Sequence, residues 1–168
     1  MKKIITYHYV KNYSAKFPFF NFLHKDNFIK QVNYFKKNEL LKIDESFDYF
    51  LKSKHKTLLT FDDGLSDHYY VYKKLLKLKI KAIFFICSYP IIKKDFLGVH
   101  KIHLIFSKFN SSEISKALDL LKVNINLDEL NFKDKNYQIK NAKNKEQIKK
   151  TKIKIYLNYF LRKNKKII

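Results

Sequence analysis

The chain has 168 residues, of which 46% are hydrophobic, so it can bury one sizeable core, and its length argues against two full domains. Its single cysteine excludes a disulfide framework and a thiolate zinc site. The formal net charge of +21 is compatible with nucleic-acid binding, but the lysines are scattered through every segment, which favours a solvated surface. We therefore expect no nucleic acid as a partner.

Targeting and membrane signals are weak in this sequence. Residues 1–5 begin like a signal peptide, but Thr6 and His8 interrupt the apolar stretch before a hydrophobic region forms. No segment approaches the roughly 20 apolar residues that a membrane span needs. Cys87 follows the apolar run 82–86, which is typical of a buried residue in a reducing compartment. We expect a cytoplasmic protein without a membrane span.

The first half of the chain alternates apolar runs with helical patterns. The expected elements, in chain order, are a strand at 3–10, a helix that Asp26 caps, a short strand at 40–43, a helix at 45–52, a strand at 57–61, a helix at 67–78 and a strand at 82–87. The last two strands are apolar throughout and flank a helix. This pattern predicts a βαβ unit in a parallel sheet that is buried on both faces.

The second half reads as mostly helical, without a clear further parallel strand. A helix is expected to begin at Ser111 or Ser112, a polar loop at 123–144, and a final helix at about 146–163. Residues 133–168 contain 13 lysines or arginines against two acids, which could bind polyanions. The many apolar residues in the same stretch favour a packed helix over a disordered basic arm.

Chemistry is expected where the strand at 57–61 ends. Two adjacent carboxylates, Asp62 and Asp63, follow this strand, and Gly64 allows the unusual backbone angles that such a break needs. In parallel sheets the functional groups lie at the carboxyl ends of the strands, and His8 lies near another such end. One acid could bind a metal while the other moves a proton. The alternative, an exposed Asp-Gly hairpin turn, is disfavoured because a helix and not a strand follows.

These residues resemble a known family. The sequence Thr-Phe-Asp-Asp-Gly at 60–64, followed by Asp67, a helix and a strand, is similar to the first motif block of the polysaccharide deacetylases, carbohydrate esterase family 4. Tyr-His-Tyr-Val at 7–10 also fits, and the resemblance covers roughly residues 4–92. It implies an α/β fold, a partial or irregular (β/α) barrel with a helical carboxy-terminal part.

The resemblance also implies a function and its residues. Asp62 would be the general base, and Asp63 would bind a divalent metal, most simply zinc, in a hydrolase that removes N-acetyl groups from a carbohydrate in surface-glycan metabolism. We expect one deacetylase-like domain over 1–168, with the motifs in 1–92 and a helical insertion in 93–168. Because the later family motifs are not recognisable, the chain resembles only the amino-terminal part of the family, and no general acid is identified.

The metal-binding histidines depart from the family pattern, which has two histidines four residues apart. The nearest pair here is His100 and His103, three apart, which would share one face of a helix. They could complete the pocket, or they could be ordinary helix residues, and we expect them on the helical insertion away from the acid pair. Two alternatives to a working enzyme stay open: a truncated, inactive deacetylase-like module, and a basic protein that binds polyanions.

Overall fold

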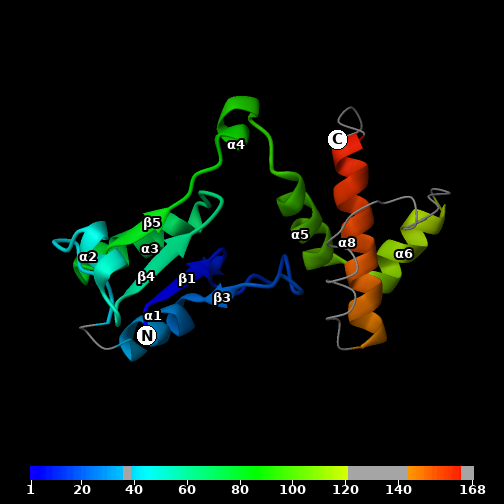
Figure 1. The fold of residues 1–168 in the computed structure, drawn as a ribbon. Helices are drawn as coiled ribbons and strands as arrows, with labels where there is room; N and C mark the ends of the chain where they lie inside the picture. Colours follow the sequence, from blue (N-terminus) through cyan, green and yellow to red (C-terminus); the bar gives the residue numbers. More distant parts are fainter. Residues whose placement is uncertain (36–38, 121–143, 164–168) are drawn as a thin grey trace. The chain divides into compact units, whose positions relative to one another are not determined.

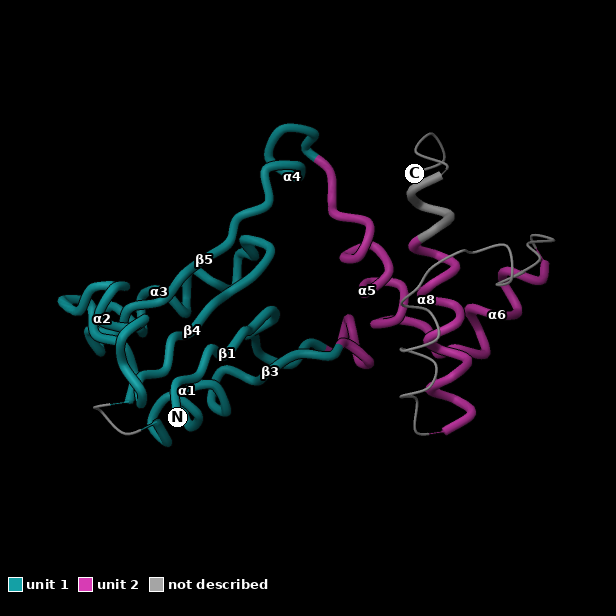
Figure 2. The backbone as a smooth tube through the Cα atoms, in the orientation of Figure 1, with its two compact units in different colours: residues 1–14, 21–94 teal, residues 15–20, 95–168 magenta. Residues whose placement is uncertain are grey.

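The computed structural model describes residues 1–35, 39–120 and 144–163 (Figure 1). The chain divides into two compact units, one of residues 1–14 and 21–94 and the other of residues 15–20 and 95–168 (Figure 2). The boundary after residue 94 lies close to the change from motif-bearing to helical sequence expected at residue 92. That the two units belong to one deacetylase-like domain stays a prediction.

A three-stranded parallel sheet forms the centre of the first unit. Strand β4 (Thr57–Phe61) lies between β1 (Lys3–Tyr7) and β5 (Ala82–Phe84). All five residues of β4 are buried, and helix α3 (Asp67–Lys77) connects it to β5. The predicted βαβ unit is therefore confirmed, and so is the burial of β4 on both faces, whereas β5, at the edge of the sheet, is only half-buried. Among the described residues no strands close a barrel, and the barrel itself stays a prediction.

Three more helices belong to the first unit: α1 (Lys25–Tyr34), α2 (Phe47–Lys52) and α4 (Ser88–Lys93). The helices expected after Asp26 and at 45–52 are confirmed, but Asp26 lies in the first turn and is not the cap. The His24 ring instead accepts a hydrogen bond from the backbone N–H of Asp26. Helix α4 was not expected, since it contains Pro90, which a helix tolerates in its first turn.

Several expected strands are shorter in the structure. The strand expected at 3–10 ends at Tyr7, and its last residue belongs to β2 (Val10–Lys11), which pairs in parallel with β3 (Leu23–His24). Residues 40–43 make only two isolated bridges, one beside β4 and one with Ile80. These short apolar runs lack a neighbouring strand along their whole length, so propensity alone does not extend them.

The strand expected at 82–87 also ends early, and as a result Cys87 lies outside the sheet. Strand β5 stops at Phe84, and the chain leaves the sheet after the backbone N–H of Phe85 donates to the carbonyl oxygen of Phe61. Phe85, Ile86 and Cys87 are exposed. The expectation of a buried Cys87 was therefore wrong, because the apolar run continues beyond the sheet that would cover it.

The core of the first unit surrounds Phe61, which is fully buried. Its ring stacks on Tyr7 and Phe84 at centroid distances of 5.3 and 4.8 Å and meets the edge of Phe28 from α1. Helix α3 contributes Val71 to the same core. Because aromatic pairs add to the stabilisation from buried area, this cluster holds the end of β4 in a defined position.

Three helices build the described part of the second unit: α5 (Gly98–Lys108), α6 (Ser111–Leu120) and α8 (Lys145–Lys163). They bury one apolar cluster, formed by Ile102, Phe106, Ile114, Leu118, Ile153 and Leu157. The helices expected at 111 and 146 are confirmed, and α8 packs as a helix with an apolar face. The loop expected at 123–144 lies, up to residue 143, outside the described residues. No described helix is long and apolar enough to cross a membrane, as expected.

The start of α6 has a clear local cause. The Asn110 side chain accepts hydrogen bonds from the backbone N–H groups of Ser112 and Glu113, at 2.9 and 3.0 Å. In return, the Glu113 carboxylate accepts from the backbone N–H of Asn110 at 2.7 Å. This reciprocal arrangement is a capping box, which satisfies N–H groups that the first turn leaves without partners.

Candidate functional site

The acid pair lies at the carboxyl end of the central strand. Asp62 directly follows β4, and its backbone N–H donates to the carbonyl oxygen of Tyr7 at 3.0 Å, which continues the pairing with β1. Parallel strands flank β4 on both sides, and helix α3 follows the turn. The expected placement is therefore confirmed, and the hairpin alternative is wrong.

The turn after β4 has an unusual backbone. Asp63 and Gly64 both adopt left-handed conformations, with φ values of 78° and 62°. A Cβ on Gly64 would lie 3.0 Å from Cγ2 and 3.3 Å from Cα of Ile86, so glycine meets both the angle and the lack of space. Asp63 has no such freedom, and holding it there costs about 1 kcal/mol. Strain of this kind is concentrated at functional sites.

His8 faces the first acid of the pair. It follows β1, and its Nε2 lies 3.8 Å from Oδ2 of Asp62. This distance is longer than a hydrogen bond and leaves the two groups close enough to share a water molecule. The side chain of His8 is 50% exposed and that of Asp62 34% exposed, so solvent reaches both. The expected proximity of His8 to the acid pair is confirmed.

Tyr9 adds a hydroxyl group that sequence reasoning treated only as part of a motif. Burial and then the negative charges of Asp63 and Asp67 raise the pKa of its phenol to about 12. A tyrosine phenol carries its proton at neutral pH, so this hydroxyl can donate a hydrogen bond near the acids. Its place directly after His8, beyond the end of a strand, was the available signal.

His68 positions the backbone of His8, and the sequence did not indicate this role. This residue of α3 is 5% exposed, and its ring packs against Phe61 and Phe84. Its Nε2 lies 2.8 Å from the carbonyl oxygen of His8, which can only accept, so Nε2 carries the proton. The hydrogen bond ties the His8 backbone to α3. The signal was its spacing from Val71, which places both on the buried face of the helix.

The second pair of histidines lies in the other unit. His100 is buried and His103 half-buried on α5, a helix on which residues three apart share a face, as expected. Both have interaction partners. Their expected separation from the acid pair stays a prediction. Within the described ranges, no three histidine, cysteine, aspartate or glutamate side chains gather closely enough to hold a metal ion.

Comparisons with protein-family models, with curated proteins and with solved structures found no match. The resemblance to the polysaccharide deacetylases therefore depends on the residues themselves. The structure shows the strand, the acid pair, the helix and the next strand in the order read from the sequence, and it shows no family. We carry the family forward as a proposal.

The grouped residues offer three kinds of chemistry. Asp62 can accept a proton, and the imidazole of His8 can donate or accept one. The Tyr9 hydroxyl can donate a hydrogen bond to a developing negative charge. Catalytic zinc sites take three protein ligands, so the described residues around Asp63 do not by themselves fit such a site.

Proposed function

We propose that the chain is a polysaccharide deacetylase-like hydrolase that cleaves the amide bond of an N-acetylated carbohydrate in surface-glycan metabolism. The observation that carries the proposal is the acid pair at the carboxyl end of β4, with His8 3.8 Å from Asp62. Strand ends of parallel sheets are where such proteins bind and convert ligands. The family resemblance supplies the substrate class.

Asp62 and His8 divide the proton transfers in the proposed reaction. The Asp62 carboxylate takes a proton from water as the water oxygen attacks the acetyl carbonyl carbon. The tetrahedral oxyanion accepts a hydrogen bond from the Tyr9 hydroxyl, which is protonated at neutral pH. Protonated His8 then donates its proton to the leaving amine, and the carbon-nitrogen bond breaks to give a free amino sugar and acetic acid, which ionises to acetate. The proton on Asp62 passes to His8 and restores the site.

The proposal includes a divalent metal ion, and it names one ligand for that ion. The resemblance makes Asp63 a ligand of a divalent cation, with zinc as the expected ion. Since no three ligands gather among the described residues, the fit is incomplete and the steps above use none. Zinc titration followed by calorimetry tests this part separately, with Asp63→Ala as the comparison. Stoichiometric binding that Asp63→Ala abolishes would establish the site.

Acetate release from N-acetylglucosamine oligomers tests the activity, with and without added zinc. Asp62→Asn should lower kcat/KM at least about a hundredfold, because an amide cannot accept the proton. Asp48→Asn, which removes an exposed acid of α2 from the same unit, is the matched control and should leave the rate unchanged. Equal rates for Asp62→Asn and the unchanged chain would contradict the proposal.

The inactive-module alternative gives a different result in the same experiments. An inactive module would release no acetate with any divalent metal, yet it would bind the sugar oligomers in calorimetry. Asp62→Asn would then leave the affinity within about twofold, because a neutral amide keeps one carbonyl acceptor for sugar hydroxyls. The polyanion-binding alternative predicts instead that heparin binds and that the sugar oligomers do not.

A further inference from the structure

An apolar surface segment follows strand β5. Between residues 85 and 92, five large apolar side chains are exposed, with exposed fractions of 53% for Phe85, 68% for Ile86, 44% for Tyr89, 68% for Ile91 and 71% for Ile92. No residue of α4 is buried. Soluble proteins rarely leave a contiguous apolar patch of this kind in water, and such patches mark interaction surfaces.

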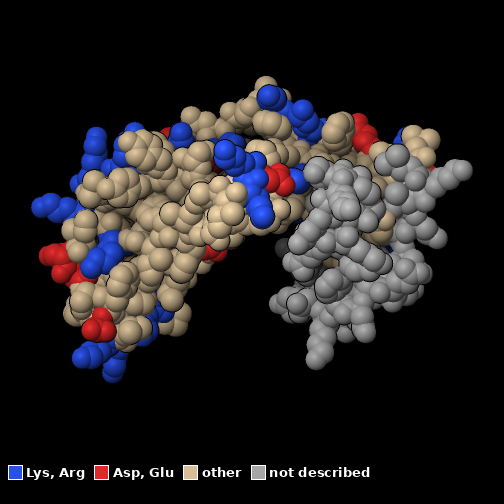
Figure 3. Space-filling view, turned by 90° about the horizontal axis from the view of Figure 1, so that it is seen from above, with Lys and Arg blue, Asp and Glu red and all other residues tan. Residues whose placement is uncertain are grey.

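Positive charge borders this patch. Lys93 ends α4, and Lys94 follows in a left-handed conformation with φ of 50°. Residues 85–94 contain no acid, and the carboxylate of Asp95, which comes next, pairs with Lys101 at 2.9 Å. Figure 3 looks onto the side on which α4 lies in Figure 1, and lysine and arginine atoms are more widespread there than acidic atoms. The whole chain carries a net charge of +21. The partner must therefore bury apolar side chains and carry negative charge that attracts the lysines.

Charge and polarity together select one partner. A second copy of the chain would bring another +21 charge to the contact and repel it. A nucleic acid would pair with the lysines and leave Ile91 and Ile92 in water. An anionic lipid surface suits both, because apolar side chains enter the boundary of the acyl chains while lysines meet the headgroups. We propose that residues 85–94 dock the protein onto an anionic membrane surface.

The docking segment adjoins the candidate site. Ile86 packs against Gly64, since a Cβ added there would lie 3.0 Å from the Ile86 side chain. Docking would thus bring the acid pair close to the plane of the headgroups, where a substrate carried by a lipid is within reach. The inference itself stands on exposure and charge, and it does not need the proposed hydrolase activity.

The chain carries its own reporter for this test. Cys87, its only cysteine, is exposed inside the segment and can be labelled with a polarity-sensitive fluorophore. We expect a blue shift on vesicles of mixed phosphatidylglycerol and phosphatidylcholine, and none on phosphatidylcholine alone. The shift should weaken in about 0.5 M salt, where screening is strong. A label on Cys87→Ser/Asn33→Cys, on the exposed side of α1, should not shift on the same vesicles.

Paired variants separate the segment from the rest of the surface. Ile91→Ser/Ile92→Ser should weaken sedimentation with anionic vesicles at least about tenfold, because the apolar insertion is lost. Leu51→Ser/Leu76→Ser removes two other exposed leucines of the first unit and should change binding less than about twofold. Lys93→Gln/Lys94→Gln should likewise weaken binding more than Lys30→Gln/Lys77→Gln, which removes the same charge elsewhere. Circular dichroism confirms that each variant folds.

Three results would overturn the proposal. The first is equal vesicle binding by Ile91→Ser/Ile92→Ser and the unchanged chain. The second is a Cys87 label that does not shift while the protein sediments with the vesicles, which would place the contact elsewhere. The third is a dimer in analytical ultracentrifugation that Ile91→Ser/Ile92→Ser abolishes, which would assign the segment to a second copy.

Discussion

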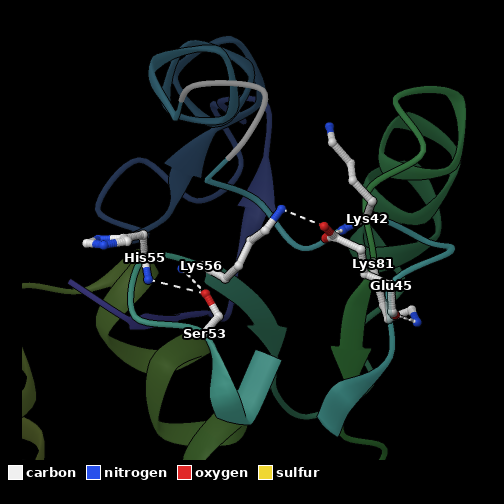
Figure 4. Close-up of polar contacts among 6 residues, drawn as sticks. All are labelled: Lys42, Glu45, Ser53, His55, Lys56 and Lys81. Carbon is white, nitrogen blue, oxygen red and sulfur yellow. Dashed lines mark hydrogen bonds and ion pairs between the residues drawn. The ribbon is translucent and has the colours of Figure 1, made fainter. Parts of the chain in front are cut away.

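The two ends of strand β4 differ in how their charged side chains are arranged: opposite charges pair at the amino end, and like charges are adjacent at the carboxyl end. At its amino end, Lys56 and Glu45 form a nearly buried ion pair with 2.7 Å between Nζ and Oε1 (Figure 4). The backbone N–H of Lys42 donates to the other oxygen of the same carboxylate, also at 2.7 Å, and the Lys81 ammonium donates to the Glu45 carbonyl oxygen. Both oxygens of the carboxylate therefore have partners.

The carboxyl end of the same strand brings like charges together. Asp62 and Asp63 are adjacent, Asp63 has a left-handed backbone, and His8 is 3.8 Å away without a hydrogen bond to Asp62. Neither the repulsion nor the strain stabilises the fold. The comparison teaches that oppositely charged groups in direct contact hold the structure at one end of β4, while adjacent like charges on a strained backbone mark the candidate site at the other.

The largest expected effect comes from breaking the pair at the amino end. Lys56→Met would leave the partly buried Glu45 carboxylate without its ion-pair partner, and we expect a loss of about 2 to 3 kcal/mol in the free energy of unfolding. Urea denaturation measures this loss. Lys52→Met, which removes an exposed lysine of α2, should change stability by less than about 0.5 kcal/mol. Equal midpoints for the two variants would contradict the structural role of the pair.

The same pair has a pH signature. Burial raises the pKa of Glu45, but the hydrogen bonds from Lys56 and from the backbone of Lys42 outweigh it, so the pKa lies below its ordinary value. A carboxyl group with a lowered folded pKa stabilises the fold above its unfolded pKa, and this stability is lost as the pH falls through the folded value. Lys56→Met should therefore flatten the loss of stability on the acid side.

The next effect tests the shape of the turn at the carboxyl end. Gly64→Ala would place a Cβ on a left-handed backbone, 3.0 Å from Cγ2 of Ile86. We expect this change to lower the free energy of unfolding by about 2 kcal/mol. Gly98→Ala, at the start of α5, is the matched change of the chain's other glycine and should be neutral or stabilising. Thermal unfolding of both variants decides the comparison, and an unaffected Gly64→Ala would mean that the turn is not constrained.

A smaller effect, of opposite sign, tests the strain at Asp63. Asp63→Gly should raise the free energy of unfolding by up to about 1 kcal/mol, because glycine adopts φ of 78° without strain. In the proposed hydrolase the same variant should lose zinc binding, because the resemblance makes Asp63 a ligand of the cation. A destabilised Asp63→Gly would show that the carboxylate itself holds the turn together, and the contrast between the two ends of β4 would weaken.

The last effect concerns Tyr9, and it is the smallest at neutral pH because it appears only under alkaline conditions. Its folded pKa of about 12 lies above the ordinary value of 10, so its contribution to stability is present below pH 10 and is lost as the pH rises through 12. Tyr9→Phe should therefore reduce the fall in stability between pH 10 and 12, measured by urea denaturation at each pH. Tyr34→Phe, an exposed tyrosine on α1, should leave that fall unchanged.

The sequence by itself determined the elements that a continuous apolar run or a regular helical spacing of apolar residues predicts. The apolar run at 57–61 is buried on both faces in β4, and the helical spacing at 67–78 corresponds to α3. The order strand, acid pair, helix and strand followed from these two, because a parallel pair needs a crossover helix. The sequence therefore places the acids at the end of a strand.

Tertiary structure decided everything that depends on which neighbour a residue meets. Cys87 looks buried in the sequence and is exposed, because β5 stops where the sheet no longer covers it. His68 looks like one more polar residue, and only the fold places it against Phe61 and under the carbonyl oxygen of His8. The contact between His68 and His8 joins residues that are 60 positions apart, so pairing and burial across the sheet created it and local propensity did not.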